Sequence, residues 1–315
     1  MTGTASDTQY PERPRRARRL GIAVLVCTVP ALCAGGWFGW QALADGARPS
    51  AAPPSAAGSS AEPTAAFPEP AGPAPASSAA APSASAPTGS GPLNGRTVLL
   101  DPGHNPGNAK HTSEINRQVD IGNARKECDT TGTSTNAGYS EAQFTLDVVH
   151  RAREILRQRG ASVVLTQDGD RPFGPCIDER ARIGNEAKAD AAVSVHADGA
   201  PAGAHGFHVI MPGKVAAGPA DTTAIVDPSH RLGELLRDRF QQATGQAYSD
   251  YIGKQGLDTR TDLGGLNLSR VPKVFIECGN MRNSGDAQHM TDPQWRQKAA
   301  EGIAEAVTAF LAAGS

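Results

Sequence analysis

The stretch RTVLLDPGH, residues 96–104, joins an apolar run to a short polar segment that ends in a histidine. Its apolar, β-branched first part predicts a strand. Two other predicted strands also end in polar groups, one at His196 and the other at Glu277. In open α/β sheets, ligands bind outside the carboxyl ends of the strands, where side chains from several strands converge. We therefore expect His104, His196 and Glu277 to share one crevice.

Strand and helix patterns alternate throughout the C-terminal part of the chain, residues 93–315. Short apolar runs predict strands over residues 96–101, 162–166, 191–196, 206–211 and 273–277. Helical spacing predicts helices over residues 140–159, 177–188, 229–244 and 292–312, with Ser140, Ser229 and Asp292 as N-caps and Gly160 and Gly245 as stops. This alternation predicts a single α/β domain with a largely parallel or mixed central sheet flanked by helices.

Glu141 lies at the start of the first of these helices. The helix carries an apolar stripe formed by Phe144, Val148, Ala152 and Ile155. Extending that stripe backwards places Glu141 on the inward face. A buried carboxylate needs a compensating charge, which points to a cation partner. The alternative is that Glu141 only interacts favourably with the helix dipole in the first turn.

Two histidines and one glutamate with an open fourth position form a known catalytic zinc set. The pattern here lacks a local HExxH helix, so the ligands would come from separate segments of the chain. A lone histidine is more often an ordinary core or surface residue, and we expect this of His111, His150, His205, His208, His230 and His289. His208 stands out among them only because it lies within a predicted strand.

A series of motifs resembles, in order, the zinc-dependent N-acetylmuramoyl-L-alanine amidases, the type 3 amidase family. The motifs are Asp101-Pro102-Gly103-His104, Ser140-Glu141, Arg180 with Gly184-Asn185 and Ala189-Asp190, Ser194-Val195-His196-Ala197-Asp198, and Glu277-Cys278-Gly279 with Asn283. The resemblance covers residues 96–312. It implies a peptidoglycan hydrolase that cuts the amide between the lactyl group of N-acetylmuramic acid and the L-alanine of the stem peptide.

The resemblance also implies roles for single residues. By the family's pattern, His104, Glu141 and His196 bind Zn²⁺, and Glu277 is the catalytic carboxylate. Such a carboxylate would take a proton from the attacking water and pass one to the leaving amine, while the metal activates that water and polarises the carbonyl. The alternative for Glu277 is a strand-end carboxylate paired with a nearby arginine such as Arg282.

Three further polar residues are candidates for supporting roles. We expect Arg180 and Asn185 to organise a helix and its neighbouring loops rather than to contact the substrate. Asp101 is a candidate outer partner for one of the zinc histidines. Asn280 stands where an aromatic residue is common in the family, which bears on substrate contact rather than on the chemistry.

A long polar insert, residues 111–138, separates the first strand from the helix that begins near Glu141. A loop of this length is usually functional or disordered. The insert carries Cys128, which in an oxidising compartment we expect to pair with Cys176, the alternative being two unpaired thiols. We therefore expect a flap over the groove, tethered to the loop of Cys176.

Three other functions remain compatible with the residues. The domain could be an inactive amidase-like module that binds or regulates the cell wall, although all four site residues are present. It could be another zinc-dependent peptidase or deacetylase, because the metal chemistry alone does not choose the acyl group. It could also be an adhesive wall protein that only binds glycan. Zinc binding and the identity of the products distinguish these possibilities.

The N-terminal third has the pattern of an exported protein. Residues 1–19 contain five arginines and precede an uncharged apolar run over residues 20–44. That run is long enough to span a membrane, and the arginines favour a cytoplasmic N-terminus. A cleaved signal peptide is the alternative. The protein would then be membrane-anchored facing the cell wall, or secreted.

Residues 45–92 are rich in Ala, Pro, Ser and Gly, and hold 11 of the 24 prolines. Such a composition predicts an extended linker without helix or strand. The chain has a formal net charge of −2, and five of its 30 basic residues lie in the N-terminal tail. The remainder has no basic patch for nucleic acid. We expect a monomer.

Overall fold

The computed structural model describes residues 91–313. The predicted basic tail, the apolar segment over residues 20–44 and nearly all of the predicted linker lie outside these residues. Within residues 91–313, no helix combines the length and apolar character that crossing a membrane requires.

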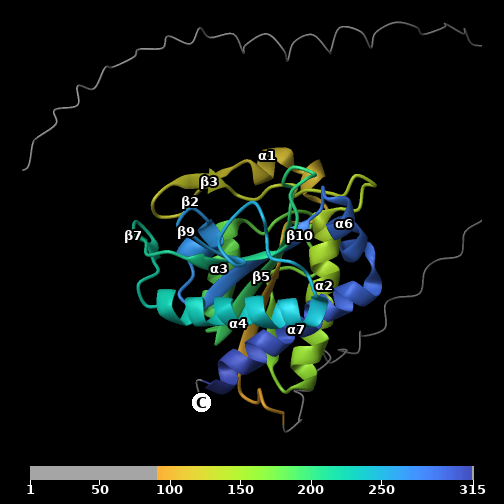
Figure 1. The fold of residues 1–315 in the computed structure, drawn as a ribbon. Coiled ribbons are helices and arrows are strands. Elements are labelled where there is room, and N and C mark those ends of the chain that lie inside the picture. Colours follow the sequence, from red (N-terminus) through yellow and green to blue (C-terminus); the bar gives the residue numbers. More distant parts are fainter. Residues whose placement is uncertain (1–90, 314–315) are drawn as a thin grey trace, which may run out of the picture. The chain divides into compact units, whose positions relative to one another are not determined.

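The described chain alternates strands and helices (Figure 1). The strands are β1 (Thr97–Pro102), β2 (Gln118–Asp120), β3 (Arg125–Glu127), β4 (Ser162–Leu165), β5 (Ala191–Asp198), β6 (His208–Pro212), β7 (Ala216–Ala217), β8 (Ala220–Asp221), β9 (Leu257–Arg260) and β10 (Lys273–Asn280). The helices are the 3₁₀ turn η1 (Asn108–Lys110), then α1 (Thr112–Ile115), α2 (Glu141–Gln158), α3 (Ile177–Glu186), α4 (Val226–Thr244), α5 (Gly264–Asn267), α6 (Ser284–Thr291) and α7 (Pro293–Ala313). All five predicted strands and all four predicted helices are present, with shifted ends.

Six strands form the central sheet in the order β4-β1-β5-β10-β6-β9. Strands β4, β1, β5 and β10 are parallel, whereas β6 runs antiparallel to β10, and β9 is parallel to β6. The predicted mixed α/β sheet is therefore confirmed. Of the strands in this sheet, β9 is the one that the sequence pattern does not predict, because its residues Leu-Asp-Thr-Arg form no apolar run and it lies at the edge of the sheet.

Alternate residues of each strand enter different layers of the core. Val98 and Leu100 pack in one cluster with residues of α2, α4 and α7. Leu99 lies on the opposite face, where a Cβ on Gly184 of α3 would come within 2.8 Å of its side chain. Helices therefore cover both faces of the sheet, with α4 and α7 in front in Figure 1 and α3 behind the sheet.

The helix ends follow local signals in α2, and one prediction for α4 is wrong. Ser140 caps α2 in a capping box with Gln143. Ser229 was expected to cap α4, but that helix begins three residues earlier, at Val226. Pro228 lies in its first turn, where the missing N–H costs no intrahelical hydrogen bond. Ser229 is buried instead, and its hydroxyl accepts the backbone N–H of Lys273 at 3.1 Å.

The chain enters the domain beside the C-terminal end of α2. Leu93 is fully buried in the core cluster. Its backbone N–H donates to the carbonyl of Arg159 at 2.9 Å, directly after α2 ends. The start of the described chain is thus fixed at the end of α2 opposite to Glu141.

A buried group of charges links β1 and β10 to α3. The carboxylate of Asp101 on β1 lies 2.9 Å from the ammonium of Lys273 on β10 and 2.8 Å from the guanidinium of Arg180 on α3. It also accepts hydrogen bonds from the hydroxyls of Ser194 on β5 and Thr166 after β4. Burial raises the pKa of Asp101, but the charges of Lys273 and Arg180 lower it by more. The pKa of Asp101 therefore lies well below the ordinary 3.8.

The Asp101→Asn variant tests this group of charges. The change leaves the buried Lys273 without its carboxylate and Arg180 with only one of its two, and breaking such a buried pair costs about 3–5 kcal/mol. We expect the free energy of unfolding at pH 7, measured in urea, to fall by about this amount.

The same variant should alter the dependence of stability on pH. The pKa of Asp101 is lower in the folded than in the unfolded state, so its contribution is present above the unfolded value and is lost as the pH falls. Urea titrations from pH 7 to pH 3 should therefore show a shallower loss of stability in Asp101→Asn than in the wild type. The exposed Asp227→Asn is the control, and an equal slope in the wild type and Asp101→Asn would contradict the assignment.

Candidate metal centre

The three predicted strand ends meet at one edge of the sheet. Strands β1, β5 and β10 are parallel neighbours, so their carboxyl ends lie together. His104 follows β1, whereas His196 lies within β5 and Glu277 within β10. His196 and Glu277 are partners in the strand register and therefore lie side by side. The three residues therefore lie close together at this edge of the sheet, as expected.

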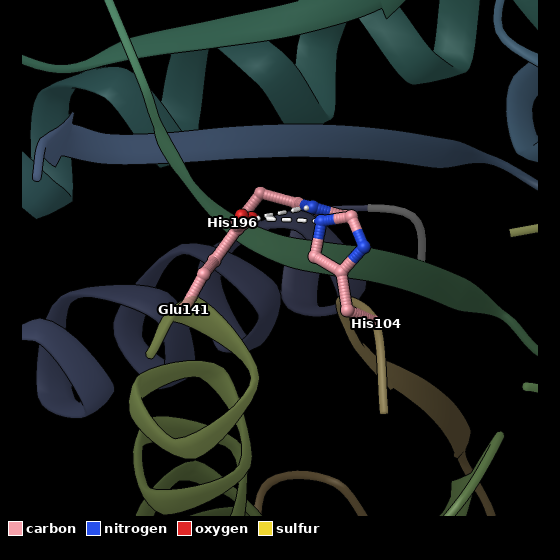
Figure 2. Close-up of side chains that lie close together, drawn as sticks. All are labelled: His104, Glu141 and His196. Atoms are coloured by element: carbon pink, nitrogen blue, oxygen red, sulfur yellow. Dashed lines mark hydrogen bonds and ion pairs between the residues drawn. The ribbon is translucent and has the colours of Figure 1, made fainter. Parts of the chain in front are cut away.

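His104, Glu141 and His196 form a compact cluster (Figure 2). Nε2 of His104 lies 3.1 Å from Oε1 of Glu141, and Nδ1 of His196 lies 3.0 Å from the same oxygen. One ligand atom from each residue falls within 4.8 Å of the others. In Figure 2 the three side chains reach toward one another from the start of α2, from β5 and from the segment after β1.

Glu141 is held in place by its helix and by two backbone donors. It is the first residue of α2 and is buried, as the apolar stripe predicted. Its Oε2 accepts the N–H of Thr133 at 2.9 Å, and its Oε1 accepts the N–H of Ala197 at 3.1 Å. Burial raises the pKa of Glu141, but His104 and His196 lower it well below its usual range. The cluster thus contains an ionised carboxylate between two imidazoles.

His104 has an unusual backbone conformation. Its φ of 60° lies in the left-handed region, which costs energy in a residue other than glycine and is often found at functional sites. Its Nδ1 lies 3.1 Å from the carbonyl oxygen of Thr130 and 3.3 Å from a carboxylate oxygen of Asp129. Burial lowers the pKa of His104, but Glu141 and Asp129 raise it to about 10.

His196 is confined on two sides. Its ring stacks on Phe275 with a centroid distance of 4.9 Å and an interplanar angle of 15°. On another side it meets the backbone of Gly103, where an added Cβ would come within 2.4 Å of Cε1 of His196. The Asp-Pro-Gly-His motif thus needs glycine at this position because the imidazole lies against the chain.

Glu277 is a partly buried residue beside this cluster, and the Oε2 atom of its carboxyl group is fully buried. Its Oε2 has no hydrogen-bond partner among the described residues. Burial raises its pKa well above the ordinary 4.5, and the neighbouring charges of Glu141 and Asp198 raise it further. Arg282, the alternative partner, donates instead to the carbonyl of Ser134 at 3.4 Å.

His208 lies directly opposite Glu277 on the antiparallel strand β6. Its Nδ1 is also buried without a hydrogen-bond partner among residues 91–313. Burial lowers its pKa. The position of His208 within a strand was its one distinguishing signal in the sequence.

The predicted supporting residues have different surroundings. Arg180 bridges two carboxylates, at 2.8 Å to Asp101 and 2.9 Å to Asp129. Asp101 is linked to His104 only indirectly, since Nδ1 of His104 contacts Asp129 and Thr130 instead. Asn185 donates to the carbonyl of Leu268 and accepts the N–H of Arg270, which fixes the loop before β10.

The insert contributes one side of the site. The expected disulfide between Cys128 and Cys176 is present and joins the insert to the start of α3. A cavity of about 250 Å³ lies between the insert and the loop around Leu263, with Lys126, Asp262 and Phe275 also in its lining. His104 and His196 both line this cavity, so a ligand there would reach the cluster.

The cluster fits a zinc ion. Two imidazole nitrogens and one carboxylate oxygen are the donors that catalytic zinc sites use, leaving a fourth position open. The buried Oε2 atom of Glu277, which has no hydrogen-bond partner among residues 91–313, is a second sign, because buried polar atoms in folded proteins normally have a partner.

Comparison with known proteins identifies relatives of the whole described domain. The sequence pattern of the N-acetylmuramoyl-L-alanine amidase family matches residues 98–309. N-acetylmuramoyl-L-alanine amidase Rv3717 of Mycobacterium tuberculosis is 40% identical over 219 residues, which are 69% of this chain and 87% of the relative.

Two solved structures are similar to the domain. The apo form of the N-acetylmuramyl-L-alanine amidase Ami1 from Mycobacterium abscessus matches with a TM-score of 0.64 and 44% identity, over 70% of this chain and 100% of that chain. Ami1 from Mycobacterium smegmatis matches with a TM-score of 0.64 and 38% identity, over 70% and 99%. At these identities the similarity extends beyond the fold to the amino-acid sequence of the domain.

The Gly103→Ala variant tests the packing of the cluster. The new methyl group would overlap His196, so the imidazole must move away from Glu141 and His104. We expect zinc affinity, measured by competition with a chromogenic chelator, to fall at least 10-fold. Gly203→Ala is the matched control, since a Cβ there meets nothing within 4 Å. Equal zinc affinity in the two variants would show that His196 does not need its observed position.

Proposed function

This chain belongs to the N-acetylmuramoyl-L-alanine amidase family, and we propose that it performs the family's hydrolysis of peptidoglycan with zinc held by His104, Glu141 and His196. The scissile bond is the amide between the lactyl group of N-acetylmuramic acid and the L-alanine of the stem peptide. The observation that carries the zinc assignment is the cluster of two imidazoles and one buried carboxylate.

Amide hydrolysis at neutral pH needs an activated water and stabilisation of the negative charge that develops on the carbonyl oxygen. Bound zinc supplies both, because it lowers the pKa of water and polarises a carbonyl. The remaining task is proton transfer. Glu277 is suited to it, since its Oε2 has no hydrogen-bond partner among the described residues and Glu277 lies beside His196 in the strand register.

Glu277 would accept a proton from the attacking water at Oε2 and deliver a proton to the nitrogen of the leaving L-alanine. General acid and base catalysis of this kind contributes roughly 10² to 10⁴ in rate. The neighbouring negative charges and the buried setting raise the pKa of Glu277, which favours retention of the proton until the amine leaves.

We also propose that the domain works outside the cytoplasm, held by the apolar segment over residues 20–44 or secreted after its removal. The N-terminal arginines followed by that segment support export. The Cys128–Cys176 disulfide is also typical of an oxidising compartment.

Product analysis tests the reaction. Purified protein loaded with zinc should release stem peptides that begin with L-alanine from defined muramoyl-peptide fragments, detected by mass spectrometry. A chelator should abolish release, and added zinc should restore it. Cleavage at another bond would indicate a different zinc hydrolase, and intact fragments with zinc bound would indicate a binding or regulatory domain.

The Glu277→Gln variant tests the proton-transfer role. The amide keeps the shape of the side chain but cannot accept the proton, so we expect kcat to fall by a factor of 10² or more while zinc stoichiometry stays unchanged. The exposed Glu234→Gln serves as the control. Turnover near that of the wild type in Glu277→Gln would remove this residue from the mechanism.

A further inference from the structure

The second ring nitrogen of His104 faces the insert. To bind a metal through Nε2, which faces Glu141, a neutral imidazole must carry its proton on Nδ1. Nδ1 lies 3.1 Å from the carbonyl oxygen of Thr130 and 3.3 Å from Oδ1 of Asp129. Both are acceptors, and the hydroxyl of Thr130, 3.2 Å from Nδ1, can accept as well, so the surroundings favour the ring form that leaves Nε2 free.

The two oxygens of Asp129 have different partners. Oδ2 accepts from the guanidinium of Arg180 at 2.9 Å, while Oδ1 faces His104 and accepts the backbone N–H of Thr130 at 2.8 Å. Asp129 is buried, with 6% of its surface exposed. Its carboxylate is therefore held in one orientation between a fixed cation and the imidazole.

Arg180 does not depend on Asp129 alone for compensation. Its other terminal nitrogen contacts Asp101 at 2.8 Å, and it also donates to the carbonyls of Pro102 and His104. Asp101 is shared with Lys273 at 2.9 Å, so Oδ2 of Asp129 also compensates the guanidinium. The other oxygen, Oδ1, does not contact Arg180 and faces the imidazole of His104.

The insert is fastened on both sides of Asp129. The preceding residue, Cys128, forms the disulfide with Cys176, and its carbonyl accepts the N–H of Ile177 at 2.7 Å. The following residue, Thr130, has its carbonyl held by the side chain of Asn108 at 2.7 Å. These contacts fix both acceptors that face Nδ1 of His104.

We propose that Asp129 is a positioning residue for the metal ligand His104, and that the disulfide-anchored insert is therefore part of the metal centre. This inference rests on the proposed function, because it requires His104 to bind the metal through Nε2. Outer partners of metal-binding histidines fix the ring orientation and raise its basicity, and losing one typically costs 10- to 100-fold in metal affinity or activity.

The test measures zinc affinity of the full chain without any substrate. Metal-free protein competes with a chromogenic chelator for zinc, and the dissociation constants of the variants are compared. We expect Asp129→Asn to bind zinc 10- to 100-fold more weakly than the wild type. Asp120→Asn is the matched control, since it lies in the same insert but is exposed on β2, and its affinity should be unchanged.

A second variant tests the role of the insert without changing a charge. Replacing both Cys128 and Cys176 with serine removes the anchor beside Asp129, and we expect a weaker loss of zinc affinity in the same direction. If circular dichroism shows that Asp129→Asn does not fold, the zinc affinity of the double-serine variant decides the question instead. Wild-type zinc affinity in a folded double-serine variant would overturn the inference for the insert.

Thermal unfolding of the metal-free proteins separates positioning from mere stabilisation. A lower melting temperature in Asp129→Asn with unchanged zinc affinity would mean that Asp129 only supports Arg180, and the proposal would be wrong. His104→Ala separates the role of the metal ligand from that of its outer partner. If His104→Ala keeps full affinity, the ligand set of the proposed function fails, whereas loss in His104→Ala alone refutes only the role of Asp129.

Discussion

The buried carboxylate of Asp101 is the interaction on which the site depends. It lies between Lys273 of β10 and Arg180 of α3, and it also accepts a hydroxyl hydrogen bond from β5. Strands β1, β5 and β10, which supply the site, are therefore joined through contacts to one buried carboxylate. Such a group resists separation, because any strand that moved would leave an ion buried without its partner. The turn that leads to His104 starts from this fixed point.

Each metal-binding candidate is positioned by a different local rule. His104 is reached through a glycine that lies against the ring of His196. Glu141 is placed by a capping box that begins α2 one residue earlier. His196 is placed by strand register, which also puts Glu277 beside it. Because these rules are independent, the cluster forms only when the whole sheet and α2 are assembled, and not in any isolated segment.

The sequence predicted the strand ends and Glu141 because both follow from short-range periodicity. It also predicted the disulfide, since Cys128 and Cys176 share polar, loop-like surroundings. Three features escaped it for physical reasons. Proline in the first turn concealed the start of α4, the edge strand β9 has no apolar run, and Asp129 lies in a segment without periodicity. The contact of Asp129 with His104 depends on pairing across 25 positions, which no local pattern reports.

Helix α2 separates the point where the chain enters the domain from the point where chemistry would occur. Glu141 stands at one end of its 18 residues, a length of about 27 Å at 1.5 Å per residue. Leu93 is bound to the carbonyl of Arg159 just beyond the other end. The point at which the described chain enters the domain is therefore about one helix length away from the metal ligands. A bulky, cross-linked polymer bound at the cluster would occupy the end of α2 opposite to Leu93.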